Sequence, residues 1–295
     1  MKSSFSCLIN LLSVGILLFL SGCTKNPFSD DKILCLEEIH GKVVLNDGAS
    51  PDSVYVWLEG FNSGTWTNEQ GDFEIKLPSV KSQGGTGLTG AYHIYFYVAN
   101  YRLDSAVVAV RNGMLQYSHG DIDEKGHLKK AISLVKALDI QTVVKPPDFP
   151  QPSNLDWWEY EEAINVEVTL KATTNDRVIA KFYSSTKGPA SILFVKKIYP
   201  EEDFLTIFET TPIGPESRMV TVEVSSDEQI WYGGFSLKIG DLPKGKYKII
   251  PYFLIDQQSI PDALFESLGL DKLKPVPQFL IHPFRREGGD FEVKR

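Results

Sequence analysis

Apolar and polar residues alternate with a period of two through much of the first half of the chain. The alternation is typical of strands that bury one face, because successive side chains of a β-strand point to opposite sides. It is clearest in residues 43–45, 54–58 and 73–77. Turn-forming residues such as Asp47-Gly48 separate these runs. The pattern therefore predicts short strands that follow one another through tight turns.

Aromatic and β-branched residues continue this pattern further along the chain. Residues 92–98 and 106–110 are rich in these side chains, which favour the pleated surface of a sheet. Residues 131–144 also read mainly as strand, although the spacing within residues 134–138 would fit a helix as well. The first half is thus expected to be a β-sheet domain.

Short motifs follow one another in a fixed order in this half: Gly41-Lys42-Val43, Asp47-Gly48, Pro51, Val54-Tyr55-Val56, Gly60, Thr67, Gly71-Asp72-Phe73 and Leu77-Pro78. In this order they resemble the carboxypeptidase regulatory-like domain, a small transthyretin-like β-sandwich of bacterial envelope proteins. The resemblance covers residues 36–145 and implies a β-sandwich there. It implies no activity, because in its namesakes this domain is an accessory to a separate catalytic domain, and no peptidase domain is recognised in this sequence.

Three positions of this resemblance have a clear physical role. Asp47-Gly48 is expected to close a β-hairpin, and Gly71 is expected to supply a positive φ before the next core residue. The chain has Asn100 before Tyr101 where the family often has glycine. Because asparagine tolerates the left-handed conformation, we expect the turn to be kept.

The second half of the chain is also rich in short β-type runs. The candidate strands are residues 164–170, 178–183, 191–196, 204–208, 219–224, 235–239 and 247–255. Seven short strands with turns between them favour an immunoglobulin-like sandwich. Pro261 or Ser259 stands near the start of a predicted short C-terminal helix. The four prolines in residues 146–156 predict a semi-rigid linker between the two halves.

The N-terminus combines a basic residue, a short apolar run and a cysteine. Lys2 precedes the apolar run 8–20, which is too short to cross a bilayer comfortably, since a spanning helix needs about 20 apolar residues. The run leads into the motif LSGC, ending at Cys23, which resembles the lipobox of exported lipoproteins. The resemblance implies cleavage before Cys23 and lipid on its thiol. An ordinary signal peptide with a chance cysteine is the alternative.

The predicted fold class is all-β, with two β-sandwich domains, transthyretin-like and then immunoglobulin-like, and a short C-terminal helix. The predicted divisions are a signal peptide (1–22), a polar tether (23–35), the carboxypeptidase regulatory-like sandwich (36–145), the proline-rich linker (146–156) and a second sandwich (157–295). Thr24 follows the lipidated cysteine, and lipoproteins lacking aspartate there usually reach the outer membrane of Gram-negative bacteria. We therefore expect an outer-membrane anchor, facing either the periplasm or the cell surface.

Charge and cysteine content narrow the classes of partner and fold. Removal of residues 1–22, whose one charged residue is Lys2, leaves 29 basic and 38 acidic residues and a net charge of −9. With no long basic run, nucleic acid is not an expected partner. Cys7 leaves with the signal and Cys23 carries lipid, so Cys35 has no disulfide partner. The fold is therefore expected to rest on apolar cores.

Two short strings resemble binding loops without their required context. Residues 85–90 match G-x-G-x-x-G, but the sequence after them predicts a strand, whereas a dinucleotide site needs a helix there. Residues 121–126 begin like a calcium loop, yet Lys125 and Ile132 stand where oxygen ligands are needed. His119 and His127 alone would make a weak metal site. Neither a cofactor nor a metal is therefore expected.

Aromatic pairs are the candidate ligand or partner contacts. Trp157-Trp158 opens the second half, and Trp231-Tyr232 precedes two glycines. Neighbouring residues of a strand point to opposite faces, so each pair should leave one ring outside the core. An exposed ring can stack on a sugar or a partner protein. The alternative is that the outer rings pack against the linker or the neighbouring domain.

The expected function is that of a non-catalytic, lipid-anchored envelope protein that acts as a binding or assembly module. The expected partners are the membrane, through the lipid, and an envelope protein or a glycan. Capture of a carbohydrate or nutrient beside an outer-membrane transporter is the alternative binding role. An enzyme of unrecognised type is the contrasting class, although the sequence has no G-x-S-x-G or H-E-x-x-H motif.

Overall fold

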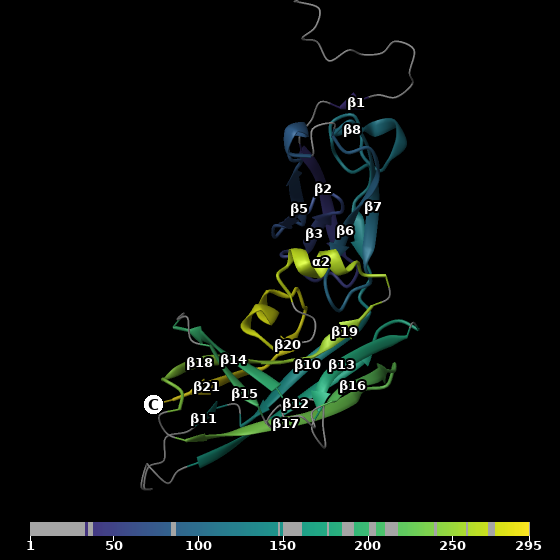
Figure 1. Cartoon of the computed structure of the whole chain (residues 1–295). Coiled ribbons are helices and arrows are strands. Elements are labelled where there is room, and N and C mark those ends of the chain that lie inside the picture. Colours follow the sequence, from purple (N-terminus) through teal and green to yellow (C-terminus); the bar gives the residue numbers. More distant parts are fainter. Residues whose placement is uncertain are drawn as a thin grey trace, which may run out of the picture.

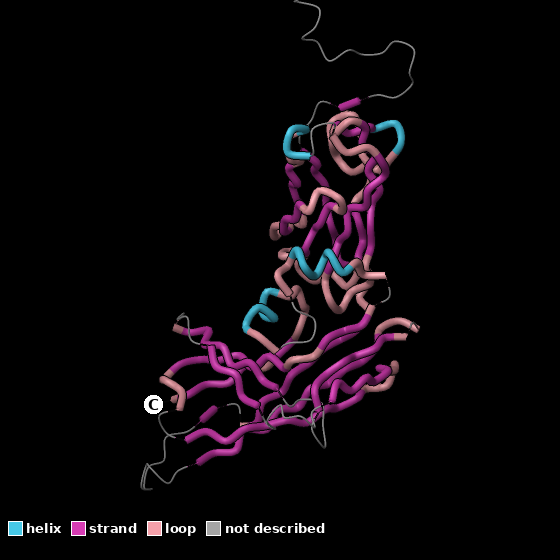
Figure 2. The backbone as a smooth tube through the Cα atoms, viewed as in Figure 1, coloured by secondary structure: helices cyan, strands magenta, loops and turns pink. Residues whose placement is uncertain are grey.

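The computed structural model shows an all-β protein, as the sequence predicts. It describes residues 33–34, 38–83, 87–146, 148–149, 161–175, 177–184, 192–200, 205–209, 218–238, 241–257, 259–270 and 275–294. The helical elements among these residues are short: α2 (Asp262–Ser267), η1 (Val80–Gln83), η2 (Tyr117–His119) and η3 (Pro277–Ile281). No helix among them is long and apolar enough to cross a membrane. The strands form two groups, with α2 and η3 between them (Figures 1 and 2).

The first group consists of two sheets that face each other. One sheet has the order β1 (Ile33–Leu34), β8 (Met114–Gln116), β7 (Asp104–Arg111), β6 (Gly90–Tyr97), β3 (Tyr55–Leu58) and β4 (Ser63–Trp66). The other has the order β5 (Asp72–Lys76), β2 (Glu38–Leu45) and β9 (Ile132–Leu134). The apolar residues of the alternating runs point inward from both sheets, and the rings of Phe73 and Phe96 meet 5.5 Å apart in the core between them. This group is a β-sandwich.

The second group consists of three sheets around one core. The first sheet has the order β17 (Gln229–Lys238), β12 (Glu161–Ala172), β10 (Leu138–Lys145) and β20 (Glu287–Gly288). The second has the order β11 (Asp148–Phe149), β21 (Asp290–Val293), β18 (Gly245–Pro251), β14 (Ile192–Tyr199) and β15 (Leu205–Glu209). The third has the order β16 (Arg218–Val224), β13 (Val178–Ser184) and β19 (Leu254–Asp256). Buried residues from all three sheets form one apolar cluster.

Strand β10 belongs to the second group, whereas the sequence places residues 138–145 in the first sandwich. All eight residues of β10 pair with β12 in antiparallel register. Leu138, Ile140 and Val144 point into the second core. An alternating strand can fill the edge of any sheet that offers an apolar face, so the pattern alone did not reveal the partner. The predicted strand 247–255 is likewise divided into β18 and β19.

Two turns differ from the sequence prediction and one agrees with it. Asp47-Gly48 forms a turn, but not a β-hairpin, because β2 and β3 lie in different sheets. Asn100 does not have the expected positive φ, and its buried side chain instead bonds to neighbouring segments. Gly71 has the expected positive φ of +80°, and a Cβ there would lie 2.1 Å from the carbonyl oxygen of Val43.

The C-terminal segment packs against the first strand group. Three apolar residues are buried against the outer face of β3 and β6, where they contact aromatic side chains: Leu264 and Phe265 of α2, and Leu268 directly after it. The ring of Phe265 lies 5.7 Å from that of Tyr97 in an edge-to-face arrangement. The predicted helix is thus present and lies next to the first strand group (Figure 1), and its apolar face is covered there.

Polar contacts accompany this apolar packing. The hydroxyl of Tyr97 and Nε2 of His282 are 2.5 Å apart and buried, and burial lowers the pKa of His282 to about 3. The ring is therefore neutral at pH 7. Gln257 donates hydrogen bonds from Nε2 to the carbonyl oxygens of Ala99 and Tyr101. These contacts join the two groups directly, whereas most of the predicted linker lies outside the described residues.

Candidate functional site

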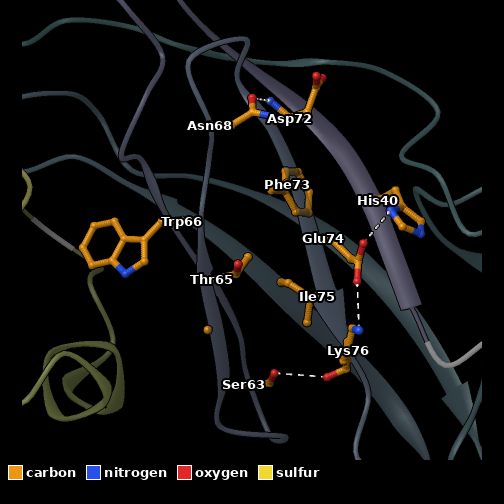
Figure 3. Close-up of a pocket in the computed structure, with 11 residues that line it drawn as sticks. His40, Ser63, Thr65, Trp66, Asn68, Asp72, Phe73, Glu74, Ile75 and Lys76 are labelled. Carbon is orange, nitrogen blue, oxygen red and sulfur yellow. Dashed lines mark hydrogen bonds and ion pairs between the residues drawn. The ribbon is translucent and has the colours of Figure 1, made fainter.

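One candidate site is an open cleft between the edge strands β4 and β5 of the first sandwich. Its volume is about 670 Å³, and its walls carry Thr65, Asn68, Asp72 and Glu74. Trp66 is 39% exposed at its border, with its ring 4.8 Å from that of Tyr55. Figure 3 shows the Trp66 side chain pointing away from Glu74 rather than over the cleft floor. The cleft is therefore polar, with its one exposed aromatic ring turned aside.

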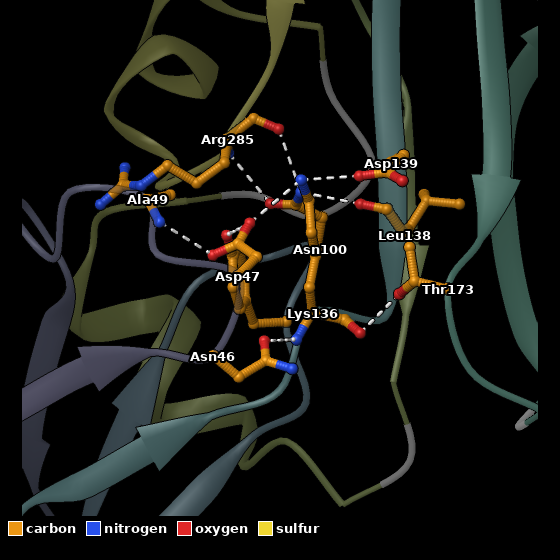
Figure 4. Close-up of polar contacts among 10 residues, drawn as sticks. Asn46, Asp47, Ala49, Asn100, Lys136, Leu138, Asp139, Thr173 and Arg285 are labelled. Atoms are coloured by element: carbon orange, nitrogen blue, oxygen red, sulfur yellow. Dashed lines mark hydrogen bonds and ion pairs between the residues drawn. The ribbon is translucent and has the colours of Figure 1, made fainter.

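A second and more enclosed pocket lies where the two strand groups meet, and a buried asparagine holds its segments together. The Nδ2 group of Asn100 donates to the carbonyl oxygens of Leu138 and Arg285, at 2.9 and 3.0 Å. Its Oδ1 accepts the backbone N–H of Arg285 at 2.9 Å. The side chain thus satisfies three polar groups from distant parts of the chain (Figure 4). Buried amides must be paired in this way to avoid a desolvation cost.

A charged cluster around Asp47 forms one wall of this junction pocket. The hydroxyl of Tyr101 donates to Asp47 Oδ2 at 2.8 Å, and Lys136 Nζ lies 3.1 Å from the same oxygen. Lys136 Nζ also lies 2.6 Å from Asp139 Oδ1. The backbone N–H of Ala49 donates to Asp47 Oδ1 at 3.2 Å. Asp47 therefore serves as the centre of the cluster.

These contacts determine the charge states in the cluster. Burial alone would raise the pKa of Asp47, but hydrogen bonds from Tyr101, Ala49 and Lys136 outweigh it and hold the pKa below its ordinary value. Burial and the neighbouring carboxylate raise the pKa of Tyr101. Burial alone would lower the pKa of Lys136, but Asp139 and Asp47 outweigh it and raise the pKa. At neutral pH the pocket wall thus presents a carboxylate, an ammonium and a neutral phenol.

The opposite wall comes from the sheet of the second group. The pocket has a volume of about 760 Å³, and this wall contains Gln141, Thr169, Lys171, Glu228 and Glu287. Lys171 and Glu228 form an ion pair of 3.7 Å. Arg285, whose guanidinium donates to the carbonyl oxygen of Asp52, lies on the first wall. A ligand in this pocket would meet charges of both signs and an amide.

The pocket opens onto the outer face of β17, β12 and β10. Strand register aligns Ile230 with Thr169, and Thr169 with Gln141. In the next row, Tyr232 lies beside Glu167. Two residues along a strand span about 6.6 Å, so Tyr232 stands one side-chain row from the pocket wall. The polar pocket and the exposed ring therefore lie on the same outer face of this sheet.

The structure separates the members of the predicted aromatic pair. Trp231 is 7% exposed and packs on Phe182, with the ring centroids 4.7 Å apart, while Tyr232 is 63% exposed. This is the division that strand alternation requires. Trp157, Trp158 and Cys23 lie outside the described residues. Of the sequence-predicted contact residues, Tyr232 is thus the one that the structure places on an open surface.

The residues of the junction pocket were not found from the sequence. Asp47 was noticed only as part of a turn, and Lys136 and Arg285 gave no motif. These three positions are separated by 89 and 149 residues in sequence. The parallel pairing of β2 with β9 brings Asp47 beside Lys136, and hydrogen bonds from Asn100 hold Arg285 near them. A polar residue in a turn carries no local signal of the segments that will fold against it.

The loops that resemble binding motifs behave as the sequence indicates. Gly90, the last glycine of the 85–90 string, begins strand β6 rather than a helix. In the 121–126 loop, Asp123 Oδ1 accepts the backbone N–H groups of Lys125 and His127, at 2.8 and 2.9 Å. The first string therefore lacks the helix of a dinucleotide site, and the second is a hydrogen-bonded turn.

Asp47→Asn is expected to lower the unfolding free energy by about 1–2 kcal/mol at pH 7, because it weakens charge-assisted hydrogen bonds. The folded-state pKa of Asp47 lies below its unfolded value. The contribution of the Asp47 carboxylate to the unfolding free energy is therefore complete above its unfolded-state pKa of about 3.9. This contribution is lost as pH falls through its folded-state pKa. Urea unfolding between pH 7 and pH 2 measures the unfolding free energies of the unmodified chain and of Asp47→Asn. The difference between them should shrink below about pH 4.

The control for this measurement is Asp72→Asn. Asp72 is half-exposed and lies 3.5 Å from Lys42, so its loss should change stability by less than about 0.5 kcal/mol. Equal effects of the two substitutions would contradict a special role for the Asp47 cluster.

Comparisons with known proteins assign no family to this chain. No protein-family model matches it, and no curated protein does. A solved structure of a Bacteroides uniformis protein, provisionally described as carbohydrate-binding, is 11% identical, covering 75% of this chain and 90% of that one, with a TM-score of 0.29. BcpA, the major pilin subunit of Bacillus cereus, is 11% identical, covering 76% of this chain and 67% of that one, with a TM-score of 0.22. Similarities at this level leave the function to be argued from the residues themselves.

Proposed function

We propose that this chain is a non-catalytic binding module, held in the outer membrane by lipid on Cys23, and that the junction pocket receives its ligand. The observation that carries the proposal is the exposed ring of Tyr232, which lies on the same sheet face as this pocket and one side-chain row from its wall. A carboxypeptidase regulatory-like sandwich at residues 36–145 and an immunoglobulin-like second unit are parts of the same proposal. In it, the first sandwich presents the second unit away from the membrane.

The chemistry of the surface favours a carbohydrate as the ligand. Sugar hydroxyl groups bond to carboxylates and amides, and Asp139, Gln141 and Glu287 supply these groups in the pocket. The apolar face of a sugar ring stacks on an aromatic side chain, and Tyr232 offers such a ring one side-chain row from the pocket wall. A pocket of about 760 Å³ has room for a short oligosaccharide.

The charge states of the pocket support binding rather than acid–base catalysis. A catalytic acid or base works best with a pKa near the working pH. The pKa of Asp47 is shifted down and those of Tyr101 and Lys136 are shifted up, in each case away from neutrality. These groups hold one another in fixed protonation states, which suits recognition of a ligand. An enzyme would need a proton donor or acceptor poised near pH 7.

A protein partner is the second candidate ligand, and one observation favours it. Ile230 is 48% exposed next to Tyr232, and β17 pairs only with β12 among the described strands. An edge strand with exposed apolar side chains can pair with a strand of another protein. Binding of this kind would use the backbone of β17 and not the pocket.

Tyr232→Ala should weaken glycan binding by about 1–3 kcal/mol, the usual loss for an aromatic anchor, with little change in the melting temperature. The measurement is a glycan array with the purified mature chain, followed by titration calorimetry with the best oligosaccharide. Tyr199→Ala is the matched control, because Tyr199 is 67% exposed on β14, away from the pocket.

Two results would decide between the ligand classes. Loss of glycan binding in both Tyr232→Ala and Gln141→Ala, with Tyr199→Ala unchanged, would support the pocket as a sugar site. If the array stays blank and Tyr232→Ala instead releases a co-purifying envelope protein, the carbohydrate proposal is wrong and the module binds a protein.

A further inference from the structure

Four residues that can bind metals gather on the outer face of the sheet formed by β5 and β2. Strand register places Glu74 directly beside His40. An isolated parallel bridge then places His127 on the other side of His40. Glu38 lies two residues before His40 and so points to the same face. Glu74, His40 and His127 thus lie side by side in one row across three chain segments. The carboxylate of Glu38 lies next to this row.

The distances within this group are close to those of a metal site. Glu38 Oε2 lies 3.6 Å from His40 Nε2, and Glu74 Oε2 lies 3.9 Å from His40 Nδ1. One ligand atom from each of these three residues lies within 4.8 Å of the others. The rings of His40 and His127 are 5.3 Å apart. Metal–ligand bonds of about 2.0–2.1 Å in a tetrahedral zinc site require ligand atoms about 3.4 Å apart. Because Glu38 lies at Nε2 of His40 and Glu74 at Nδ1, a shared ion would bind one of these nitrogens, and the carboxylate at the other nitrogen would rotate toward it.

The backbone holds both histidines in place. The N–H of His40 donates to the carbonyl oxygen of Gly126 at 2.9 Å, and the N–H of Leu128 donates to the carbonyl oxygen of His40 at 2.8 Å. These two bonds fix the segment on either side of His127 against β2. Rigid strands and a tied loop keep the cost of assembling a site low.

Outer contacts orient the candidate ligands. Asp123 Oδ1 lies 4.0 Å from His127 Nδ1. A carboxylate behind a histidine is a common support of metal ligands. Lys76 Nζ lies 3.5 Å from Glu38 Oε1 and 3.4 Å from Glu74 Oε1, so each acid has its other oxygen on the His40 side. Figure 3 shows Glu74 between His40 and Lys76. Lys76 thus positions both carboxylates for a shared ligand.

We infer that Glu38, His40, Glu74 and His127 form a binding site for a divalent transition metal, with Zn²⁺ as the best fit. Two imidazoles and two carboxylates are a mixed nitrogen and oxygen set that zinc accepts, whereas calcium and magnesium prefer oxygen alone. The site lies on the outer face of the first sandwich, and it does not depend on the junction pocket or on the nature of its ligand.

Titration calorimetry of the full mature chain with Zn²⁺ tests this inference. We expect one saturable site per chain, and at least ~tenfold weaker binding of Ca²⁺ and Mg²⁺. His40→Gln and Glu74→Gln should each weaken Zn²⁺ binding by ~tenfold or more. The control is His93→Ala, which removes a histidine of the opposite sheet and should leave the affinity unchanged. Thermal melts without metal will show whether each variant is folded, and Zn²⁺ should raise the melting temperature of the unmodified chain.

X-ray absorption at the zinc edge gives an independent readout. Imidazole scattering with only nitrogen and oxygen in the first shell would support the site. Sulfur in the shell would place the metal on a cysteine and overturn the inference. So would unchanged affinity in folded His40→Gln, or no saturable binding by the full chain.

Discussion

Phe265→Ala is expected to lower the unfolding free energy by about 3–5 kcal/mol, the usual cost of truncating a buried phenylalanine. The side chain is 8% exposed in the contact between α2 and the first strand group. Its ring lies 5.7 Å from that of Tyr97 and 5.8 Å from that of His282. Because the contact joins elements more than 160 residues apart in sequence, its loss should also loosen the junction between the two groups.

Two measurements check this expectation. Chemical unfolding gives the change in free energy, and the variant should unfold in two separated transitions if α2 couples the groups. Proteolytic cleavage within residues 146–156 gives the second readout, since the fragments of the unmodified chain should stay associated and those of the variant should separate. Glu266→Ala, an exposed neighbour on the same helix, should change stability by less than about 0.5 kcal/mol. Equal effects of the two substitutions would show that α2 contributes no specific contact.

Cys23→Ala is expected to abolish lipid labelling of the protein. The proposal of a lipid anchor gives the protein a single acylated residue, and two or more acyl chains make the anchor stable. Without the thiol no thioether can form, so the variant should stay uncleaved or become soluble. Labelling of cells with a radioactive or clickable fatty acid, followed by detergent partitioning, measures both effects.

Cys35→Ala is the matched control for this experiment. Cys35 lies twelve residues further along the chain and should have no part in the anchor. Lipid labelling should therefore persist in Cys35→Ala. Unchanged detergent partitioning of Cys23→Ala would contradict the lipoprotein proposal, and the chain would then need another means of attachment.

The proposed metal row and the proposed ligand pocket have different structural origins. The row arises from strand register alone, because Glu74, His40 and His127 are neighbours across one sheet. The pocket arises from the packing of separate sheets, turns and the C-terminal segment. Substitutions at the junction such as Phe265→Ala should therefore disturb ligand binding more than metal binding.

Local patterns in the sequence were sufficient to predict the strands and several of their details. The alternating runs around residues 43–45 and 73–77 became β2 and β5, with their apolar side chains inside. Alternation also predicted that Trp231 and Tyr232 would divide between core and surface. The positive φ of Gly71 followed from the motif in which it stands. These features depend on the two-residue repeat of a strand or on the steric limits of one residue, and both are local.

The tertiary structure alone decided which surfaces those elements would share. Residues 138–145 have the alternation of a strand, yet their pairing with β12 depends on which apolar face is within reach. Asp47-Gly48 was expected to close a hairpin, but β2 and β3 went to different sheets, and Asp47 became the centre of a charged cluster. Asn100 was expected to serve a turn through its backbone, but its side chain joins three segments instead. A sequence pattern tells which face of an element is apolar, whereas the partner of that face is chosen by contacts among distant residues.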